Sequence, residues 1–308
     1  MKTVLEQPAR PFIKWAGGKG QLISQMRGYL PKQLRNTGRM KNYFEPFLGG
    51  GAVFFWLTSE FDFENVYLYE INSEVANCYQ TIRNRINKLV GELGSLEADY
   101  FSKSDDKLEQ FFYSMRSEYN GLILSRTPNN LVRKAALLIF LNKTCYNGLY
   151  RVNLKGEFNV PFGRYKKPAI CDEENLYAVN DVLKNAEIIN GDFAQCLAHA
   201  DSESFVYCDP PYRPISETAN FTNYSKDTFN DYEQKRLKEV FDKLNDVGAL
   251  VMLSNSDPKN FDPKDTFFDD LYRGYNIRRL KAIRMINCNA SKRGEIKEIL
   301  VRNYEGEW

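Results

Sequence analysis

The chain has 308 residues, of which 43% are hydrophobic and 27% charged, and its 42 basic and 40 acidic residues leave a net charge of +2. This composition is typical of a soluble globular protein, and the length allows about two domains. Its longest apolar run, Ala135–Leu141, is far shorter than the ~20 residues of a membrane-spanning helix, and Met1–Val4 begins no apolar signal segment, so we expect neither. A single histidine, His199, and six cysteines without a C-x-x-C pair exclude His-pair metal motifs, zinc ribbons and thioredoxin-like sites, so we expect chemistry from Asp, Glu, Lys, Tyr, backbone groups or a bound cofactor.

The first half of the chain alternates helices and strands and then continues with helices alone. A helical spacing of apolar residues predicts a helix over Gln21–Leu30, ended by Pro31. Apolar runs predict strands at Tyr43–Phe47 and Val66–Tyr69, with a helix starting at Ala52 between them. Helical patterns then fill Glu74–Val90, Leu108–Tyr119 and Leu131–Leu141. The stretch Tyr146–Pro168 is rich in Gly, Asn and Pro, which indicates hairpin and loop rather than helix.

Alternation of strands and helices resumes in the second half. Strands are predicted at Glu187–Ile189, Phe205–Cys208 and Ala249–Leu253, a helix at Tyr232–Leu244, and a closing β-pair at Asn276–Arg284 and Lys297–Asn303. Such alternation at both ends favours an α/β fold with a doubly wound, mostly parallel sheet. The helical middle interrupts it, so we predict a domain built from residues 1–72 and 172–308, with residues 73–171 as an inserted domain.

The near-neutral net charge hides a strong asymmetry. Residues 126–167 hold nine basic residues and one acid, and residues 276–294 hold six basic residues and no acid. Such asymmetry is typical of a polyanion-binding surface, although a solvated basic face would look the same. Aromatic and amide side chains that can stack on bases or read base edges are interleaved with the first basic stretch, namely Tyr146, Asn147, Tyr150, Asn153, Phe158, Asn159, Phe162 and Tyr165.

A glycine-rich turn follows the first predicted strand. Phe47–Gly51 reads Phe-Leu-Gly-Gly-Gly at a strand-to-helix junction, where a backbone can approach a ligand and a helix N-terminus points at it. Glu70 ends the next strand about 20 residues on, where dinucleotide and nucleoside folds hold ribose hydroxyls. Each feature also has a plain structural interpretation, as a tight turn and a solvated strand end.

A second glycine-containing motif, Trp15-Ala16-Gly17-Gly18-Lys19-Gly20, resembles a phosphate-binding P-loop only superficially. Lys19 is followed by Gly20 instead of Ser or Thr, and position 14 is Lys14 instead of glycine, so the P-loop pattern fails. An aromatic ring, a flexible turn and a cation remain. Trp15 as a core residue and Lys19 as a surface charge are the alternatives.

Asp209-Pro210-Pro211-Tyr212, directly after the apolar strand Phe205–Cys208, is the most specific short motif. The two prolines stiffen the turn and remove two N–H donors. A carboxylate, a free carbonyl and an aromatic ring are thereby placed at the carboxyl edge of a parallel sheet, which is the ligand crevice of open α/β folds. Adenine and cytosine each present an exocyclic NH₂ that needs acceptors and a ring on which Tyr212 can stack.

Together these motifs resemble the DNA adenine methyltransferase (Dam) family of D12 class N6-adenine methyltransferases, over nearly the whole chain and in the family's order. The matching segments are Pro11–Lys19 (PFIKWAGGK), Phe44–Gly51 (FEPFLGGG), Tyr146–Arg151 (YNGLYR) with Phe158–Tyr165 (FNVPFGRY), and Asp209–Tyr212 (DPPY). The resemblance implies a Rossmann-like sheet that binds S-adenosylmethionine (AdoMet), with an inserted helical and β-hairpin domain that reads DNA.

The resemblance also implies roles for single residues. It makes Asp209, Pro210 and Tyr212 catalytic. AdoMet contacts would come from Trp15, Ala16, Lys19, Phe47, Gly49, Gly51, Glu70 and Asp209, with Asp192 and Phe193 flanking the cofactor's adenine. DNA contacts would come from Lys14, Asn147, Arg151, Pro161 and Arg164. Arg151 is a candidate for a bidentate contact to guanine, and Asn147 for filling the gap left by a displaced base. Glu70 departs from the family, whose close members often have Asp there.

The activity that the resemblance implies is methyl transfer from AdoMet to N6 of an adenine flipped out of duplex DNA, within GATC, without a metal. The partner would be double-stranded DNA and no membrane, with the protein a monomer or weak dimer on DNA in the cytoplasm, nucleoid-associated or phage-encoded. A cytosine-N4 or RNA amino-methyltransferase, and a DNA-binding regulator without catalysis, are the alternatives. A role in restriction-modification, repair, replication or phage defence stays open.

Overall fold

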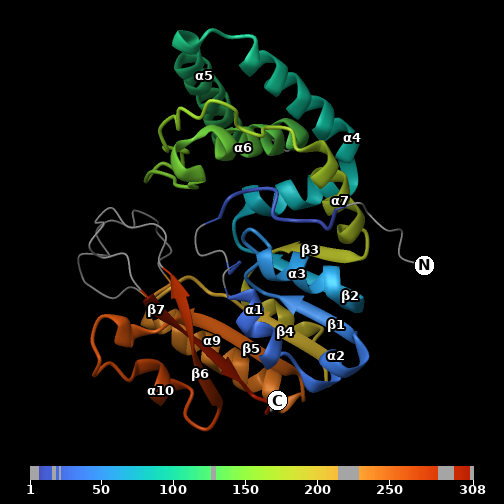
Figure 1. Cartoon of the computed structure of the whole chain (residues 1–308), viewed down its shortest axis with the longest axis vertical. Helices are drawn as coiled ribbons and strands as arrows, with labels where there is room; N and C mark the ends of the chain where they lie inside the picture. The colour runs from blue at the N-terminus through green and yellow to red at the C-terminus, as the bar shows by residue number, and fades with distance from the viewer. Residues whose placement is uncertain are drawn as a thin grey trace.

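A seven-stranded sheet forms the centre of the computed structural model, which describes residues 7–15, 19–20, 22–125, 130–213, 229–283 and 295–305 (Figure 1). The strand order is β3-β2-β1-β4-β5-β7-β6, and β7 runs antiparallel to β5 and β6 while the other pairs are parallel. The strands are β1 Arg39–Glu45, β2 Asp62–Glu70, β3 Ala186–Asn190, β4 Ser204–Cys208, β5 Leu250–Ser256, β6 Asn276–Ile283 and β7 Glu295–Arg302. This confirms the predicted α/β class and the closing β-pair.

The sheet is covered on both faces, as a doubly wound fold requires. In β4, Phe205 and Tyr207 pack into one hydrophobic cluster, and Val206 and Cys208 pack into another. Helices α3 (Ala52–Glu60), α4 (Ser73–Phe101) and α7 (Glu173–Leu183) supply the first cluster. The 3₁₀ turn η3 (Phe193–Ala198) and helices α9 (Asp231–Asp246) and α10 (Phe267–Leu271) supply the second. The chain reverses its winding direction between β1 and β4, which lie side by side.

The helices differ from the sequence prediction mainly in extent. The prediction Gln21–Leu30 becomes the short helix α1 (Ile23–Met26) and the 3₁₀ turn η1 (Arg27–Tyr29), followed by the unpredicted α2 (Lys32–Thr37). Helix α4 continues eleven residues beyond Val90, with non-helical backbone angles at Arg85. Helix α7 was not predicted at all, although the Asp172 side chain caps it by accepting a hydrogen bond from the Asn175 N–H.

The middle of the chain forms a helical part at the top of Figure 1, made by α4, α5 (Asp105–Leu124) and α6 (Leu131–Thr144). Arg133 of α6 joins the three helices, because it pairs with Glu118 of α5 at 2.7 Å and with Glu92 of α4 at 3.0 Å. The apolar run of α6 is buried throughout. In the described part of the chain, the helices lack the combination of length and apolar character that crossing a membrane needs.

After α6 and the one-turn η2 (Tyr146–Gly148), the chain forms a hairpin-like loop, as expected from its composition. Antiparallel bridges join Cys145 to Phe162 and Val152 to Phe158. Gly156, with φ +83°, closes the tip, where its N–H donates to the Asn153 carbonyl. The strand that returns from the tip is held by the Asn120 side chain of α5, which both donates to and accepts from the Phe158 backbone.

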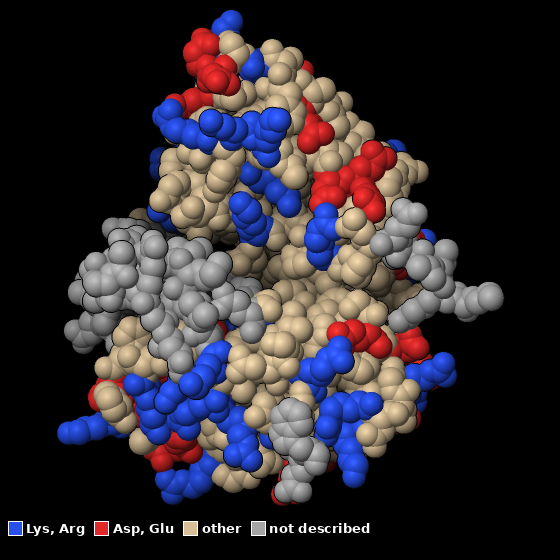
Figure 2. Space-filling model, in the orientation of Figure 1, with Lys and Arg blue, Asp and Glu red and all other residues tan. Residues whose placement is uncertain are grey.

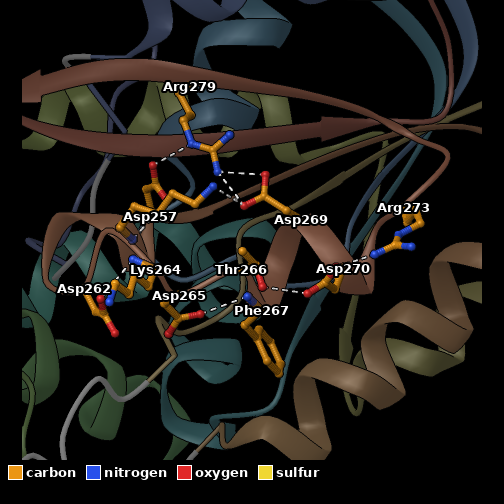
Figure 3. A network of polar contacts seen from close by, with 11 residues as sticks. Asp257, Asp262, Lys264, Asp265, Thr266, Phe267, Asp269, Asp270, Arg273 and Arg279 are labelled. Carbon is orange, nitrogen blue, oxygen red and sulfur yellow. Dashed lines mark hydrogen bonds and ion pairs between the residues drawn. The ribbon is translucent and has the colours of Figure 1, made fainter.

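The connection from β5 to β6, which includes the 3₁₀ turn η4 (Pro258–Asn260), is organised by charged side chains (Figure 3). Arg279 of β6 donates to the buried Asp257 at 2.8 Å and to both oxygens of Asp269 in α10. Within the loop, Asp265 accepts from the Phe267 N–H and the Thr266 hydroxyl donates to Asp270. These contacts fix the loop beside β5, and Asp265 also pairs with Arg213, which directly follows Tyr212.

Candidate active site

Two of the predicted motifs lie at the same edge of the sheet. The glycine loop 47–51 follows the carboxyl end of β1, and Asp209 follows the carboxyl end of the adjacent β4. Adjacent parallel strands that connect in opposite directions leave a crevice between these loops, where open α/β folds bind ligands. The charge of Asp209 also acts on Glu45, the last residue of β1. The glycine loop and Asp209 therefore follow the ends of neighbouring strands.

A buried cation is at the centre of the site. The Lys19 ammonium lies 2.8 Å from Asp209 Oδ1, 3.0 Å from Glu298 Oε2 and 3.1 Å from the Tyr212 hydroxyl. Lys19 is only 2% exposed, so this is not the surface charge considered as its alternative. The Tyr212 hydroxyl in turn donates to Glu298 Oε1 at 2.7 Å. We call Lys19, Asp209, Tyr212 and Glu298 the lysine cluster.

The two oxygens of Asp209 are in different situations. Oδ1 accepts from Lys19 and, at 3.1 Å, from the Ser254 hydroxyl of β5. Ser254 is itself 2.8 Å from the hydroxyl of Tyr207 in β4. Among the described residues, Oδ2 has no hydrogen-bond donor, so it is free to accept one from a ligand.

Burial controls the protonation of the cluster. Burial raises the pKa of Asp209, and the adjacent Lys19 partly offsets that effect. For Lys19, the carboxylates of Asp209 and Glu298 outweigh the effect of burial and raise its pKa. Burial raises the pKa of Tyr212 to about 12 and that of Glu45 to about 8. At neutral pH Lys19 is therefore charged, Tyr212 is a neutral hydroxyl, and Glu45, which accepts from the Tyr43 hydroxyl, is mostly a neutral acid.

The glycine loop needs glycine for steric reasons. Gly49 and Gly51 have φ of +49° and +69°, a region that favours glycine. A Cβ on Gly49 would lie 2.8 Å from the Trp15 ring, and one on Gly51 would lie 2.7 Å from the Tyr79 hydroxyl. Glu70 accepts hydrogen bonds from the Gly49 N–H and the Asn72 N–H, both at 2.8 Å, so its carboxylate lies against the loop. Trp15 is a packing partner of this loop, and Ala16 is outside the described residues.

An aromatic layer lies beside this loop. Phe47 stacks on Phe193 at 5.1 Å between ring centroids, and Phe229 contacts both rings. Arg236 of α9 lies 4.0 Å above the Phe193 ring and forms two hydrogen bonds to Asp192. Hydrogen bonding by Arg236 is the main reason that the pKa of Asp192 is lowered. The structure thus places Phe47, Asp192 and Phe193 together, with Asp192 ionised.

The residues predicted to face DNA surround the hairpin and are largely exposed. The Lys14 ammonium lies 4.8 Å from the ring centroid of Tyr165, whose hydroxyl accepts from the Asn147 N–H. Arg151 donates to Asn159 across the hairpin at 2.7 Å. The Pro161 carbonyl accepts from the Tyr146 N–H, and Arg164 pairs with Glu109 of α5 at 2.7 Å. In Figure 2 basic side chains gather on the helical part above a hollow in this face.

The N-terminal segment links the hairpin to the glycine loop. Trp15 lies against Gly49 and also stacks on Tyr150, with ring centroids 5.6 Å apart. The buried Asn142 of α6 accepts from the Lys14 N–H and donates to the carbonyls of Lys14 and Gly148. Asn142, Ser254 and Glu298 are site residues that the sequence reasoning missed, because none of them belongs to a glycine, proline or charge pattern.

Comparisons with known proteins agree with this geometry. The family model described as "D12 class N6 adenine-specific DNA methyltransferase" matches residues 15–286. The chain is similar to the type II methyltransferase M.MjaIII of Methanocaldococcus jannaschii, with 48% identity over 96% of this chain and 99% of that protein. It is also similar to proteins named DNA adenine methylase from Serratia marcescens (37% identity, 94% and 97% covered) and Escherichia coli K12 (35% identity, 94% of each covered).

Proposed function

The chain belongs to the D12 class of N6 adenine-specific DNA methyltransferases, and from this premise we propose that it transfers a methyl group from AdoMet to N6 of an adenine flipped out of duplex DNA. We propose GATC as the target sequence, on the similarity of the hairpin segments to the family's reading hairpin. The observation that carries the proposal is the free Oδ2 of Asp209, beside Tyr212 and next to the glycine loop.

The residues present fit AdoMet. Glycine at positions 49 and 51 lets the loop pack closely against Trp15 and Tyr79, where any Cβ would collide, and Glu70 lies against the Gly49 backbone with a buried carboxylate. Each oxygen of the Glu70 carboxylate accepts one hydrogen bond from the backbone, so each has a further lone pair that can accept from a ribose hydroxyl. Phe47 and Phe193, with Asp192, supply an apolar and a polar surface for an adenine ring. When bound there, AdoMet would supply an electrophilic sulfonium methyl group.

We propose that the inserted part, residues 73–171, positions the DNA. The target amine is buried in a base pair, so the base must leave the stack, at a cost of a few kcal/mol. Lys14, Arg151 and Arg164 would offset that cost through phosphate and base contacts. Asn147, held at φ +56° next to Gly148, would enter the gap left by the base, and Pro161 would border it.

The flipped base would be held by the DPPY motif. Tyr212, 39% exposed, offers its ring for stacking, while Asp209 Oδ2 and the Pro210 carbonyl accept the two hydrogens of the amine. This directs the nitrogen lone pair away from the acceptors, and catalysis then rests on positioning and charge stabilisation. Methyl transfer would break the methyl–sulfur bond, form the N–C bond and place positive charge on the nitrogen. Asp209 would stabilise that charge and could accept the proton that must leave.

Incubation with tritium-labelled AdoMet and duplexes that contain or lack GATC tests the proposal. We expect label in GATC-containing DNA only, and product that resists a nuclease blocked by N6-methyladenine. Label in GATC-free DNA would refute GATC as the target sequence. Labelled DNA that is still cut by the nuclease that N6-methyladenine blocks would refute N6 of adenine as the methylated atom.

We further propose that the protein acts in the cytoplasm on chromosomal or phage DNA as a monomer or weak dimer. The relative from Methanocaldococcus jannaschii is named a type II methyltransferase, which favours a role in restriction-modification for this chain. Survival of host DNA exposed to a nuclease of the same target sequence, with and without the gene, tests that role.

A further inference from the structure

We infer that Glu298 is a positioning residue for methyl transfer: it holds Lys19 and Tyr212 so that Asp209 keeps one oxygen free for the target amine. The inference rests on the proposed function and assigns a residue outside the DPPY motif to the same site. Glu298 would act through its neighbours, without touching the substrate.

The position of Glu298 is well defined by the sheet. It lies on β7, the antiparallel strand, opposite Ser256 of β5 and Leu280 of β6. Its side chain is buried, with 6% of the residue exposed, and a buried carboxylate is unfavourable unless it is paired. Each oxygen has one partner in the site: Oε1 accepts from the Tyr212 hydroxyl at 2.7 Å and Oε2 lies 3.0 Å from Lys19 Nζ.

The donors and acceptors of the cluster match in number. A lysine ammonium has three hydrogens to donate and no acceptor. Its three neighbours are Asp209 Oδ1, Glu298 Oε2 and the Tyr212 hydroxyl oxygen, at 2.8, 3.0 and 3.1 Å. The ammonium thus has one close oxygen for each of its three hydrogens, although the contact with Glu298 Oε2 is an ion pair without hydrogen-bond geometry, so Lys19 has no reason to reach Asp209 Oδ2.

The hydroxyl of Tyr212 is oriented by the same arrangement. It accepts from Lys19 and donates to Glu298, so both its functions are used within the cluster. This holds the ring over Lys19, with the ammonium 4.7 Å from the ring centroid. One face of the ring is covered by the cation, and the 39% exposure of the residue leaves area on which a base can stack.

Glutamine at position 298 would disturb this arrangement without changing its size. An amide has one acceptor oxygen and two N–H donors. If that oxygen accepts from Lys19, the NH₂ faces the Tyr212 hydroxyl, which must then turn its hydrogen elsewhere. Asp209 would become the sole carboxylate partner of Lys19, so the ammonium would move toward it and compete with the target amine.

Charge around Asp209 gives a second, independent readout. The groups that face it are Lys19, Glu298 of β7, Glu45 of β1, Tyr207 of β4 and Ser254 of β5. After burial and the opposing effect of Lys19, the negative charge of Glu298 raises the pKa of Asp209. Removal of that charge therefore lowers the pKa of Asp209, and the acid limb of the rate profile moves to lower pH.

The test compares E298Q with K297Q, which changes the exposed neighbour on the same strand. Single-turnover methyl transfer to a duplex substrate is measured with labelled AdoMet, and DNA and AdoMet affinities are measured separately. We expect a rate loss of about 10- to 100-fold in E298Q, as for one charge-assisted hydrogen bond, with largely unchanged affinities and a more acidic limb. K297Q should match the parent.

A double-mutant cycle with Y212F separates positioning from general destabilisation. Both substitutions remove the Tyr212–Glu298 contact, so their losses should not multiply: in the Y212F background E298Q should add only the part that acts through Lys19. A wild-type rate in E298Q, an unshifted acid limb, or losses that multiply in the double variant would each overturn the inference. If E298Q unfolds, Y212F alone decides, because a wild-type rate there would also overturn it. An inactive parent protein would instead refute the proposed function.

Discussion

Replacement of Asp209 by asparagine separates catalysis from stability in this site. The asparagine oxygen can replace Oδ1, which accepts from Lys19 and Ser254. Its NH₂ group then takes the place of Oδ2 and directs donors at the target amine, which is itself a donor. One transition-state acceptor is lost, so we expect methyl transfer to fall by about 10²–10³-fold.

The stability of Asp209→Asn should not fall. Because burial raises the pKa of Asp209, the folded protein holds this proton more tightly than the unfolded chain. Its ionised form therefore opposes folding once the pH exceeds the unfolded pKa, and this loss grows until the pH reaches the folded pKa. Asparagine removes that effect, while Glu298 remains as the partner of Lys19. We expect a melting temperature at pH 8 no lower than that of the parent.

The assay is single-turnover methyl transfer, with DNA affinity and thermal unfolding measured on the same preparations. Asp246→Asn, on the exposed end of α9, is the matched control and should behave as the parent. DNA affinity should survive in Asp209→Asn. Near-parental turnover, or a loss of activity that follows a lower melting temperature, would refute the reasoning.

Three further substitutions test other parts of the structure. The pKa of Glu45 is raised to about 8 by burial, so its contribution to the unfolding free energy is full below pH ~4.5 and is lost as pH rises to about 8. Glu45→Gln should therefore flatten the pH dependence of the unfolding free energy, measured by urea titration, by at most ~5 kcal/mol across that window. An unchanged pH dependence would contradict this. Arg151→Ala should relax discrimination at one base pair by ~1–3 kcal/mol in competition assays, whereas an equal loss for all sequences would indicate a phosphate contact. Arg213, directly after Tyr212, pairs with Asp231 and Asp265. Arg213→Ala should therefore lower the unfolding free energy by ~1–3 kcal/mol and also lower the rate of methyl transfer. Parental values of both quantities would show that these pairs do not position Tyr212.

Much of the fold could be predicted because its strands are short apolar runs that end in recognisable motifs. Phe205–Cys208 is buried on both faces, so its hydrophobicity is continuous and its end is marked by two prolines. Helix α7 was missed because acidic and amide residues interrupt its apolar face, and its start depends on the cap by Asp172. The extension of α4 was missed because its second half meets α5 and α6, which are contacts between distant segments.

The site could be predicted only as far as its residues belong to local motifs. The sequence predicts that Gly49, Glu70 and Asp209 are close, since each follows or ends a strand and parallel strands share an edge, whereas Lys19 is placed with them only by the family resemblance. It contains no sign that Glu298 joins them, because Glu298 lies in an ordinary strand and reaches the site only through the position of β7 between β5 and β6. The direction of the Lys19 ammonium, toward Asp209 and Glu298, likewise follows from burial and pairing and has no local sequence signal.

The hairpin and the central sheet pack on one continuous hydrophobic core, and this packing bears on how a target base would be selected. The hydrophobic cluster that contains Phe54 and Leu68 beside the sheet also contains Leu137 of α6 and Phe158 of the hairpin. Trp15 lies between the glycine loop and Tyr150. Interiors packed in this way transmit displacement rather than absorb it. The distance between a base pair that the hairpin would read and the base that Asp209 would hold is therefore set by core packing, so methylation at a fixed position within a short sequence would need no moving domain.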